Sequence, residues 1–157
     1  MKNHHLLLIR FSALGDVAMT VPVIRSLYHT YPDLKITFVS RPYVAPLFAE
    51  FDNFDFYPTD FKNRHSGIKG LWTLFQELKK IPFSGVADLH GVLRTHVLGV
   101  FYRINGHRFV TIDKGRSEKK AWIRKKSKKF QPLTPTVYLY ADVFRKLGAP
   151  VTLEQPE

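Results

Sequence analysis

The stretch His5-Leu-Leu-Leu-Ile-Arg-Phe-Ser-Ala-Leu-Gly-Asp-Val-Ala-Met-Thr-Val-Pro-Val-Ile-Arg-Ser-Leu27 decides the fold, because it predicts a strand, a tight turn and a helix in succession. Leu6 to Ile9 form a continuous apolar run, which is typical of a strand that is covered on both faces in a parallel sheet. The turn is Ser12 to Asp16. After it, one stripe of the helix can pack back on the strand, through Val17, Val21, Ile24 and Leu27.

Two residues are expected to shape this stretch. Gly15 allows a backbone conformation that a residue with a β-carbon resists. Pro22 either kinks the helix or lies in its first turn, with the regular helix starting near Thr20. In both cases Asp16 lies at the carboxyl end of the first strand, where open α/β sheets build their binding crevices.

The rest of the chain alternates between strands and helices. Strands are expected at 35–40, 54–57, 85–88 and 107–112, and helices at 42–48, 68–80, 92–104 and 135–147. Thr134 is expected to cap the last helix, and Gly148 to end it. This order predicts an α/β fold with a Rossmann-like, mainly parallel sheet and helices on both faces.

Two of these helices carry a specific packing expectation. Ile68 falls in one apolar stripe with Leu71, Leu74 and Phe75, so it is expected in the core. The helix 92–104 is apolar nearly all round, and we therefore expect it to be substantially buried.

Composition limits the class of protein. A chain of 157 residues that is 45% hydrophobic can form one domain with a real core. It has no cysteine, so disulfides and thiolate metal sites are excluded. Its apolar runs are too short to span a membrane, and no signal-peptide pattern precedes them. These features favour a cytoplasmic protein.

The net charge of +11 is confined to two segments. Residues 114–129 contain nine Lys or Arg against one Glu, and residues 62–69 contain three basic residues and no acid. The remaining acidic and basic residues balance. Such local positive fields attract phosphate-bearing partners, such as nucleic acid, anionic lipid or a phosphorylated sugar, although a charge run can also be a solvated surface.

Several motif classes are missing from the sequence. Ser12 to Asp16 lacks the G-x-G-x-x-G spacing of a dinucleotide site, and the chain has no Walker A loop and no nucleophile elbow. Its histidines and carboxylates show no metal-ligand spacing. No cofactor and no metal are therefore expected.

Asp16 has two plausible roles. It can be a helix N-cap that accepts hydrogen bonds from backbone N–H groups, which is the commoner reason for Asp at a strand-to-helix turn. It can also be a general base that takes a proton from an attacking hydroxyl. The local sequence leaves both open.

A second candidate site is Ala87-Asp-Leu-His-Gly-Val-Leu-Arg-Thr95, again a strand end that enters a helix. If the first and fourth strands are neighbours, Asp88, His90 and Arg94 face the same crevice as Asp16. Arg94 and Thr95 would bring donors for phosphate or carboxylate. The structural alternative is that Asp88 or His90 caps the helix while Gly91 fits a close contact.

Together these segments resemble the N-terminal domain of glycosyltransferase family 9, the ADP-heptose:lipopolysaccharide heptosyltransferases. The resemblance rests on Ser12-Ala-Leu-Gly-Asp-Val17, Thr20-Val-Pro-Val-Ile-Arg25, Tyr31-Pro-Asp33, Asp88-Leu-His-Gly91 and Phe144-Arg-Lys-Leu-Gly148. It implies the N-terminal half of a GT-B fold, which binds the lipopolysaccharide acceptor. The nucleotide sugar ADP-heptose would bind mainly to a C-terminal domain. Transfer would be inverting and independent of metal.

The resemblance also implies roles for individual residues. Asp16 matches the base that activates the acceptor hydroxyl, with Ser12 and Gly15 shaping its loop. The segments 62–69 and 114–129 fall where the family has loops that face an acceptor rich in carboxylates and phosphates. The residues expected near the acceptor are Lys62, Arg64, Asp88, His90, Arg94 and Thr95.

The chain departs from the family in two respects. Ala13 stands where some members have a second hydroxyl. The chain is also about half as long as a family member, so residues 1–150 are expected to be the acceptor-binding domain and 151–157 the start of an interdomain linker. With the donor-binding domain absent, this part alone should have little or no transferase activity.

Two other hypotheses concern the basic run 114–129. The chain could be a basic α/β module that binds nucleic acid without catalysis, although Trp122 alone is too few aromatics for a stacking platform. The run could instead hold the protein at the anionic inner membrane, as a peripheral contact. The membrane hypothesis is compatible with the heptosyltransferase hypothesis.

Overall fold

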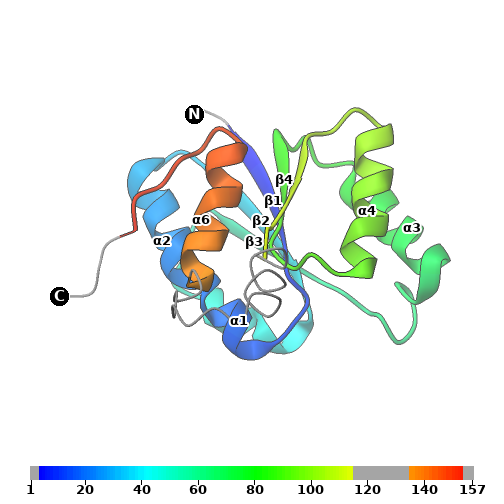
Figure 1. Ribbon diagram of the computed structural model, residues 1–157. Helices are drawn as coiled ribbons and strands as arrows, with labels where there is room; N and C mark the ends of the chain where they lie inside the picture. Colours follow the sequence, from blue (N-terminus) through cyan, green and yellow to red (C-terminus); the bar gives the residue numbers. More distant parts are fainter. Residues whose placement is uncertain (1–3, 115–134, 154–157) are drawn as a thin grey trace, which may run out of the picture.

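A five-stranded parallel sheet divides the molecule, with the strand order β3-β2-β1-β4-β5 (Figure 1). The computed structural model describes residues 4–114 and 135–153. The strands are β1 (His5–Ile9), β2 (Lys35–Ser40), β3 (Phe54–Pro58), β4 (Gly85–Asp88) and β5 (Phe109–Thr111). The condition that joins the two candidate sites, that the first and fourth strands are neighbours, is therefore met.

Helices cover both faces of this sheet, as Figure 1 shows. One layer holds α1 (Leu14–Ala18), α2 (Thr20–Thr30), α6 (Thr136–Lys146) and the short 3-10 helix η1 (Pro42–Phe48). The other layer holds α3 (Gly67–Leu78) and α4 (Leu93–Ile104). The predicted Rossmann-like α/β architecture is confirmed.

The apolar run of β1 is continuous because its side chains enter two different cores. Leu6 and Leu8 point into the core under α2 and α6, whereas Leu7 and Ile9 point into the core under α3 and α4. Both sets are almost fully buried. This two-sided burial is what a strand in the middle of a parallel sheet requires.

The turn after β1 confirms one expectation and corrects another. The helix breaks at Met19, and α2 starts at Thr20, so Pro22 lies in its first turn. Gly15, however, lies inside α1 with ordinary helical backbone, and a β-carbon there would meet nothing within 4 Å. The prediction that Gly15 is needed for a special conformation is wrong.

Two packing expectations for the other layer are also wrong. Ile68 is 71% exposed, because it lies on the flank of α3 next to the buried stripe. In α4 the residues Thr95, Leu98, Gly99 and Tyr102 are buried, but the opposite side of the helix faces outward. The apolar character of α4 is therefore not explained by burial within the described residues.

The last helix confirms one expectation and corrects another. Gly148 ends α6 with a φ of +86°, as expected, but α6 starts at Thr136 with Pro135 as its N-cap, so the prediction that Thr134 is the cap and Pro135 the first helical residue is wrong. Thr134, residues 115–129 of the basic run and residues 154–157 of the expected linker lie outside the described residues. Val151 and Leu153 pack against the core under α2 and α6, and the domain boundary at 150 stays a prediction.

Candidate functional site

The candidate site lies at the carboxyl ends of β1 and β4, where the strand order reverses direction. Ile9 is in register with Asp88, so the residues that follow them, Arg10 to Asp16 and Leu89 to Arg94, leave the sheet side by side. Open α/β sheets bind ligands at such a switch point.

Asp16 is held in place by Arg10, the first residue after β1. Arg10 Nη2 lies 3.0 Å from Asp16 Oδ2, and Arg10 Nη1 donates a hydrogen bond of 2.8 Å to the Leu89 carbonyl oxygen. The Arg10 side chain is 9% exposed, whereas that of Asp16 is 44% exposed. A buried guanidinium thus joins the two loops and orients a carboxylate that remains accessible.

The N-cap hypothesis for Asp16 is excluded by its position. Asp16 is the third residue of α1, the N-cap position belongs to Ala13, and no side chain caps this helix. The backbone of Asp16 is fixed from the other side of the site, because the buried Tyr140 hydroxyl donates a hydrogen bond of 2.9 Å to its carbonyl oxygen. Burial raises the pKa of Tyr140 to about 12, so the hydroxyl keeps its proton for this bond.

Asp88 builds the second loop. Its side chain is fully buried, and Oδ1 accepts hydrogen bonds of 3.0 Å from the backbone N–H groups of His90 and Gly91. Gly91 has a φ of +62°, and a β-carbon there would lie 3.2 Å from Ile112 Cγ2. The predicted close contact at Gly91 is therefore present, and Asp88 shapes the loop without being the N-cap of α4.

His90 faces this site as a neutral ring. Its Nδ1 accepts a hydrogen bond of 3.3 Å from the Phe11 backbone N–H, so the neutral ring carries its proton on Nε2. Burial and the positive charges of Arg10 and Lys114 lower the His90 pKa to about 4, although the Asp16 charge opposes them. At neutral pH, His90 can therefore donate a hydrogen bond from Nε2.

Two further arginines lie over the same aromatic ring. The Arg94 guanidinium lies 4.4 Å from the centroid of the Phe61 ring, and that of Arg41 lies 5.7 Å from it. Phe61 itself contacts the buried Phe11 edge to face, with the centroids 4.7 Å apart. Cation–π contact holds both guanidinium planes without using their hydrogen-bond donors.

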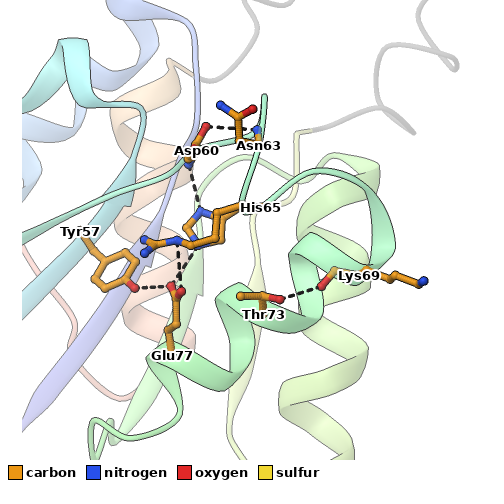
Figure 2. A network of polar contacts seen from close by, with 8 residues as sticks. Tyr57, Asp60, Asn63, His65, Lys69, Thr73 and Glu77 are labelled. Atoms are coloured by element: carbon orange, nitrogen blue, oxygen red, sulfur yellow. Dashed lines mark hydrogen bonds and ion pairs between the residues drawn. The ribbon is translucent and has the colours of Figure 1, made fainter.

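The turn that carries Phe61 is fixed by a polar network (Figure 2). The Asp60 backbone N–H donates to His65 Nδ1 at 2.9 Å, and His65 Nε2 lies 3.0 Å from Glu77 Oε2. The same Glu77 oxygen accepts a hydrogen bond from the Tyr57 hydroxyl, and Arg64 Nε lies 3.2 Å from Glu77 Oε1. The Arg64 side chain is thus tied to α3, while Lys62 is exposed on the turn.

The charges in this network shift two pKa values. Burial raises the pKa of Glu77, but the hydrogen bonds from Tyr57 and His65 and the Arg64 charge outweigh it, so the net shift is downward. Burial and the hydrogen bond to Glu77 raise the pKa of Tyr57 to about 12. Glu77 is therefore a carboxylate that holds three donors at neutral pH.

The remaining predicted residues differ in accessibility. Ser12 is half-buried between β1 and α1, and Gly15 leaves open space beside Asp16. Thr95 is fully buried, and its hydroxyl exchanges hydrogen bonds of 2.9 Å with the Val92 backbone. Thr95 therefore stabilises the start of α4, and we leave it out of the proposed site.

Sequence reasoning missed Arg10, Arg41, Phe61 and Tyr140. A simple pattern could have found the two arginines, because each directly follows a strand, after Ile9 and after Ser40. Phe61 and Tyr140 lack such a pattern, since only tertiary packing brings them to the site.

Three buried atoms of this site have no hydrogen-bond partner within the described residues. They are Arg10 Nε, Arg41 Nε and Asp88 Oδ2. Buried polar atoms are normally paired, so each of these three atoms has hydrogen-bonding capacity left for a further partner.

Comparison with known proteins agrees with this geometry. No protein-family model matches the chain. The lipopolysaccharide core heptosyltransferase OpsX of Haemophilus influenzae is 24% identical over 132 residues, which are 84% of this chain and 37% of that protein. The chain is thus similar in sequence to a lipopolysaccharide core heptosyltransferase, and it spans 37% of that protein's length.

Solved structures share the fold of this chain. A family 9 glycosyl transferase from Veillonella parvula superposes with a TM-score of 0.65 at 20% identity, covering 100% of this chain and 47% of that one. The E. coli heptosyltransferase WaaC with ADP superposes with a TM-score of 0.66 at 14% identity, covering 98% of this chain and 50% of that one. The chain thus spans about half or less of the length of these proteins.

The described residues also lack two other features. Within the described ranges, His, Asp and Glu form no group of three or more that could hold a metal ion. Over the same ranges, no helix has both the length and the apolar character needed to cross a membrane.

Proposed function

We propose that this chain is the acceptor-binding half of an inverting, metal-independent glycosyltransferase that moves heptose from ADP-heptose to the inner core of lipopolysaccharide. The donor would be held mainly by a second, C-terminal domain. The observation that carries the proposal is the Arg10–Asp16 pair at the switch point, where a buried cation orients an accessible carboxylate.

Asp16 is the proposed general base. One of its oxygens takes the proton of an acceptor hydroxyl, while that hydroxyl oxygen forms a bond to the anomeric carbon of the heptose. The bond from that carbon to the diphosphate breaks at the same time, and ADP leaves with the electron pair. Attack on the face opposite the leaving group inverts the anomeric configuration.

The surrounding cations suit an acidic acceptor. The charges of Arg41 and Lys114 act on His90, and Arg94 shares the Phe61 ring with Arg41. A guanidinium can bind a carboxylate or phosphate with two hydrogen bonds. His90 Nε2 adds a neutral donor. Lys62 and Arg64 would extend this positive surface along the turn after β3, and a peripheral contact with the inner membrane would bring the lipid-linked acceptor close.

Acceptor binding tests the cationic part of the site on this chain. Arg94→Gln is expected to weaken binding of a lipopolysaccharide core oligosaccharide about tenfold, the loss of one charge-assisted contact. Arg25→Gln is the matched control, because Arg25 is exposed and paired with Glu50. Calorimetric titration measures both, and equal affinity of the two variants would contradict the assignment of Arg94.

Turnover tests Asp16 and requires the donor-binding half, so whether the reading frame continues past Glu157 is the first observation to make. In the protein that joins both halves, Asp16→Asn is expected to lower kcat about 10²- to 10⁴-fold with acceptor binding retained. Asp33→Asn, an exposed aspartate after α2, is the control. Unchanged turnover in Asp16→Asn would remove Asp16 as the base.

A further inference from the structure

The outer surface of the α3–α4 layer exposes large apolar side chains. Ile104 is 77% exposed, Leu93 79%, Ile68 71%, Val100 51% and Trp72 45%. We call these five residues the apolar face. Single exposed apolar residues are common, but a group of them on two neighbouring helices indicates an interaction surface.

In α4 this face is a regular stripe. With 3.6 residues per turn, positions 93, 100 and 104 fall on one side of the helix, and the buried positions 95, 98, 99 and 102 fall on the opposite side. The stripe runs roughly 16 Å along the helix at 1.5 Å per residue. One side of α4 is thus apolar because it packs on the sheet, and the other side is apolar without such packing.

The two helices form one continuous face. Trp72 of α3 contacts Phe101 of α4 edge to face, with the ring centroids 5.1 Å apart. Ile68 lies one turn before Trp72 on α3. The Trp72–Phe101 contact therefore joins the α3 residues to the α4 stripe.

The segment that contains both helices is strongly basic. Residues 61–112, which include both helices, contain eight Lys or Arg and only two acids, Glu77 and Asp88. Asp88 is fully buried, and Glu77 is bound by Tyr57, His65 and Arg64. The basic residues include Lys69, Lys79 and Lys80, which are exposed at the two ends of α3. An apolar face with cations at its edges complements an anionic lipid surface.

We infer that the apolar face docks on an anionic membrane surface. Ile68, Trp72, Leu93 and Ile104 would enter the boundary between headgroups and acyl chains, and the lysines of α3 would contact lipid phosphates. Aliphatic side chains do not stack on bases, so nucleic acid suits this face poorly. The inference gives the proposed function a location, because Leu93 directly precedes Arg94 and docking would bring the candidate site to the membrane surface.

Vesicle binding tests the inference on the chain itself. Wild type is expected to sediment with vesicles of equimolar phosphatidylglycerol and phosphatidylcholine, and Ile68→Gln/Leu93→Gln/Ile104→Gln is expected to bind about tenfold more weakly or worse. The matched control, Met19→Gln/Tyr43→Gln/Tyr138→Gln, removes exposed apolar residues from the other layer and should bind like wild type. Because the basic run 114–129 is unchanged in all three proteins, its electrostatic contribution cancels.

Fluorescence locates the contact. In a Trp122→Phe background, Trp72 emission should shift to the blue on vesicle addition and be quenched by brominated lipid. Equal vesicle binding by the two triple variants, or unchanged Trp72 emission in bound protein, would overturn the inference. So would sedimentation velocity in which wild type self-associates without lipid while the apolar-face variant stays monomeric, since the face would then be a contact between two copies. The Asp16 and Arg94 tests stand apart from all of these outcomes.

Discussion

The layer of α1, α2 and α6 differs from the layer of α3 and α4 in how its surface meets solvent. In the first layer, Arg25 pairs with Glu50 at 2.7 Å, and Arg145 pairs with Asp142 at 2.6 Å. Residues 13–60 contain six acids and three Lys or Arg, whereas residues 61–112 contain two acids and eight. The second layer combines this positive charge with the apolar face.

The two layers nevertheless rest on the same sheet through equally closed cores. Phe144 of α6 and Phe75 of α3 are both fully buried. The two layers therefore differ in the charge and apolar exposure of their outer surfaces, and the stability of the fold does not require that difference. A surface feature that folding does not need is better explained by what the surface binds.

Truncating one large side chain in each core is expected to have the largest effect on stability, and it tests whether the two cores are equally well packed. Phe144→Ala and Phe75→Ala are each expected to lower the free energy of unfolding by about 3–5 kcal/mol, through lost burial and the cavity left behind. Urea denaturation measures both. A far smaller loss for Phe75→Ala would mean that the α3–α4 core is loosely packed, and the exposed residues of that layer would then reflect poor packing.

Much of the fold, in contrast to the surface difference between the layers, could be predicted from the sequence. The strands and helices were accessible because each buried strand is a short apolar run and each helix has a stripe at helical spacing. The approach of Asp16 to Asp88 and His90 was expected only if the first and fourth strands are neighbours, and the structure supplies that strand order. The roles given to Asp16, Lys62, Arg64 and Arg94 remain predictions, since position does not test chemistry.

Other features depend on packing that a sequence pattern does not encode. The pattern of α4 showed apolar residues all round but not which of them face the sheet, so burial was overestimated. The predicted buried stripe of α3 included Ile68, which is exposed in the structure. Phe61 lies at the site because it packs on Phe11. Glu77 is contacted by Tyr57, His65 and Arg64, which come from other segments of the chain.

A second prediction compares two glycines at helix starts, one in each layer. A β-carbon at Gly70 in α3 would lie 2.0 Å from the His65 backbone carbon, so Gly70→Ala is expected to cost about 3 kcal/mol of unfolding free energy. Gly15→Ala in α1 meets open space and should gain up to about 1 kcal/mol from helix propensity. Thermal unfolding measures both, and a tolerated Gly70→Ala would show that the turn before α3 can move away from the helix.

The third and smallest effect concerns carboxylates on the two layers. Glu77→Gln replaces the acceptor of three donors with an amide that can satisfy only part of them, at an expected cost of about 2 kcal/mol of unfolding free energy at neutral pH. Glu50→Gln removes one partner of an exposed pair and is expected to change stability by about 0.5 kcal/mol or less. Urea denaturation at neutral pH measures the loss of unfolding free energy for both variants, and the loss should be larger for Glu77→Gln.

The pH dependence of the unfolding free energy tests the role of the Glu77 charge. The pKa of Glu77 in the folded protein lies below its ordinary value of 4.5, so its ionised form stabilises the fold above that pH. This stabilisation is lost as the pH falls through the folded-state pKa, because the protonated acid no longer accepts from all three donors. The difference in unfolding free energy between wild type and Glu77→Gln should therefore stay constant from pH 7 to about 4.5 and narrow below it. A difference that stays constant into more acidic solution would show that Glu77 acts through its shape, and the turn carrying Phe61 would then be held by packing instead of by charge.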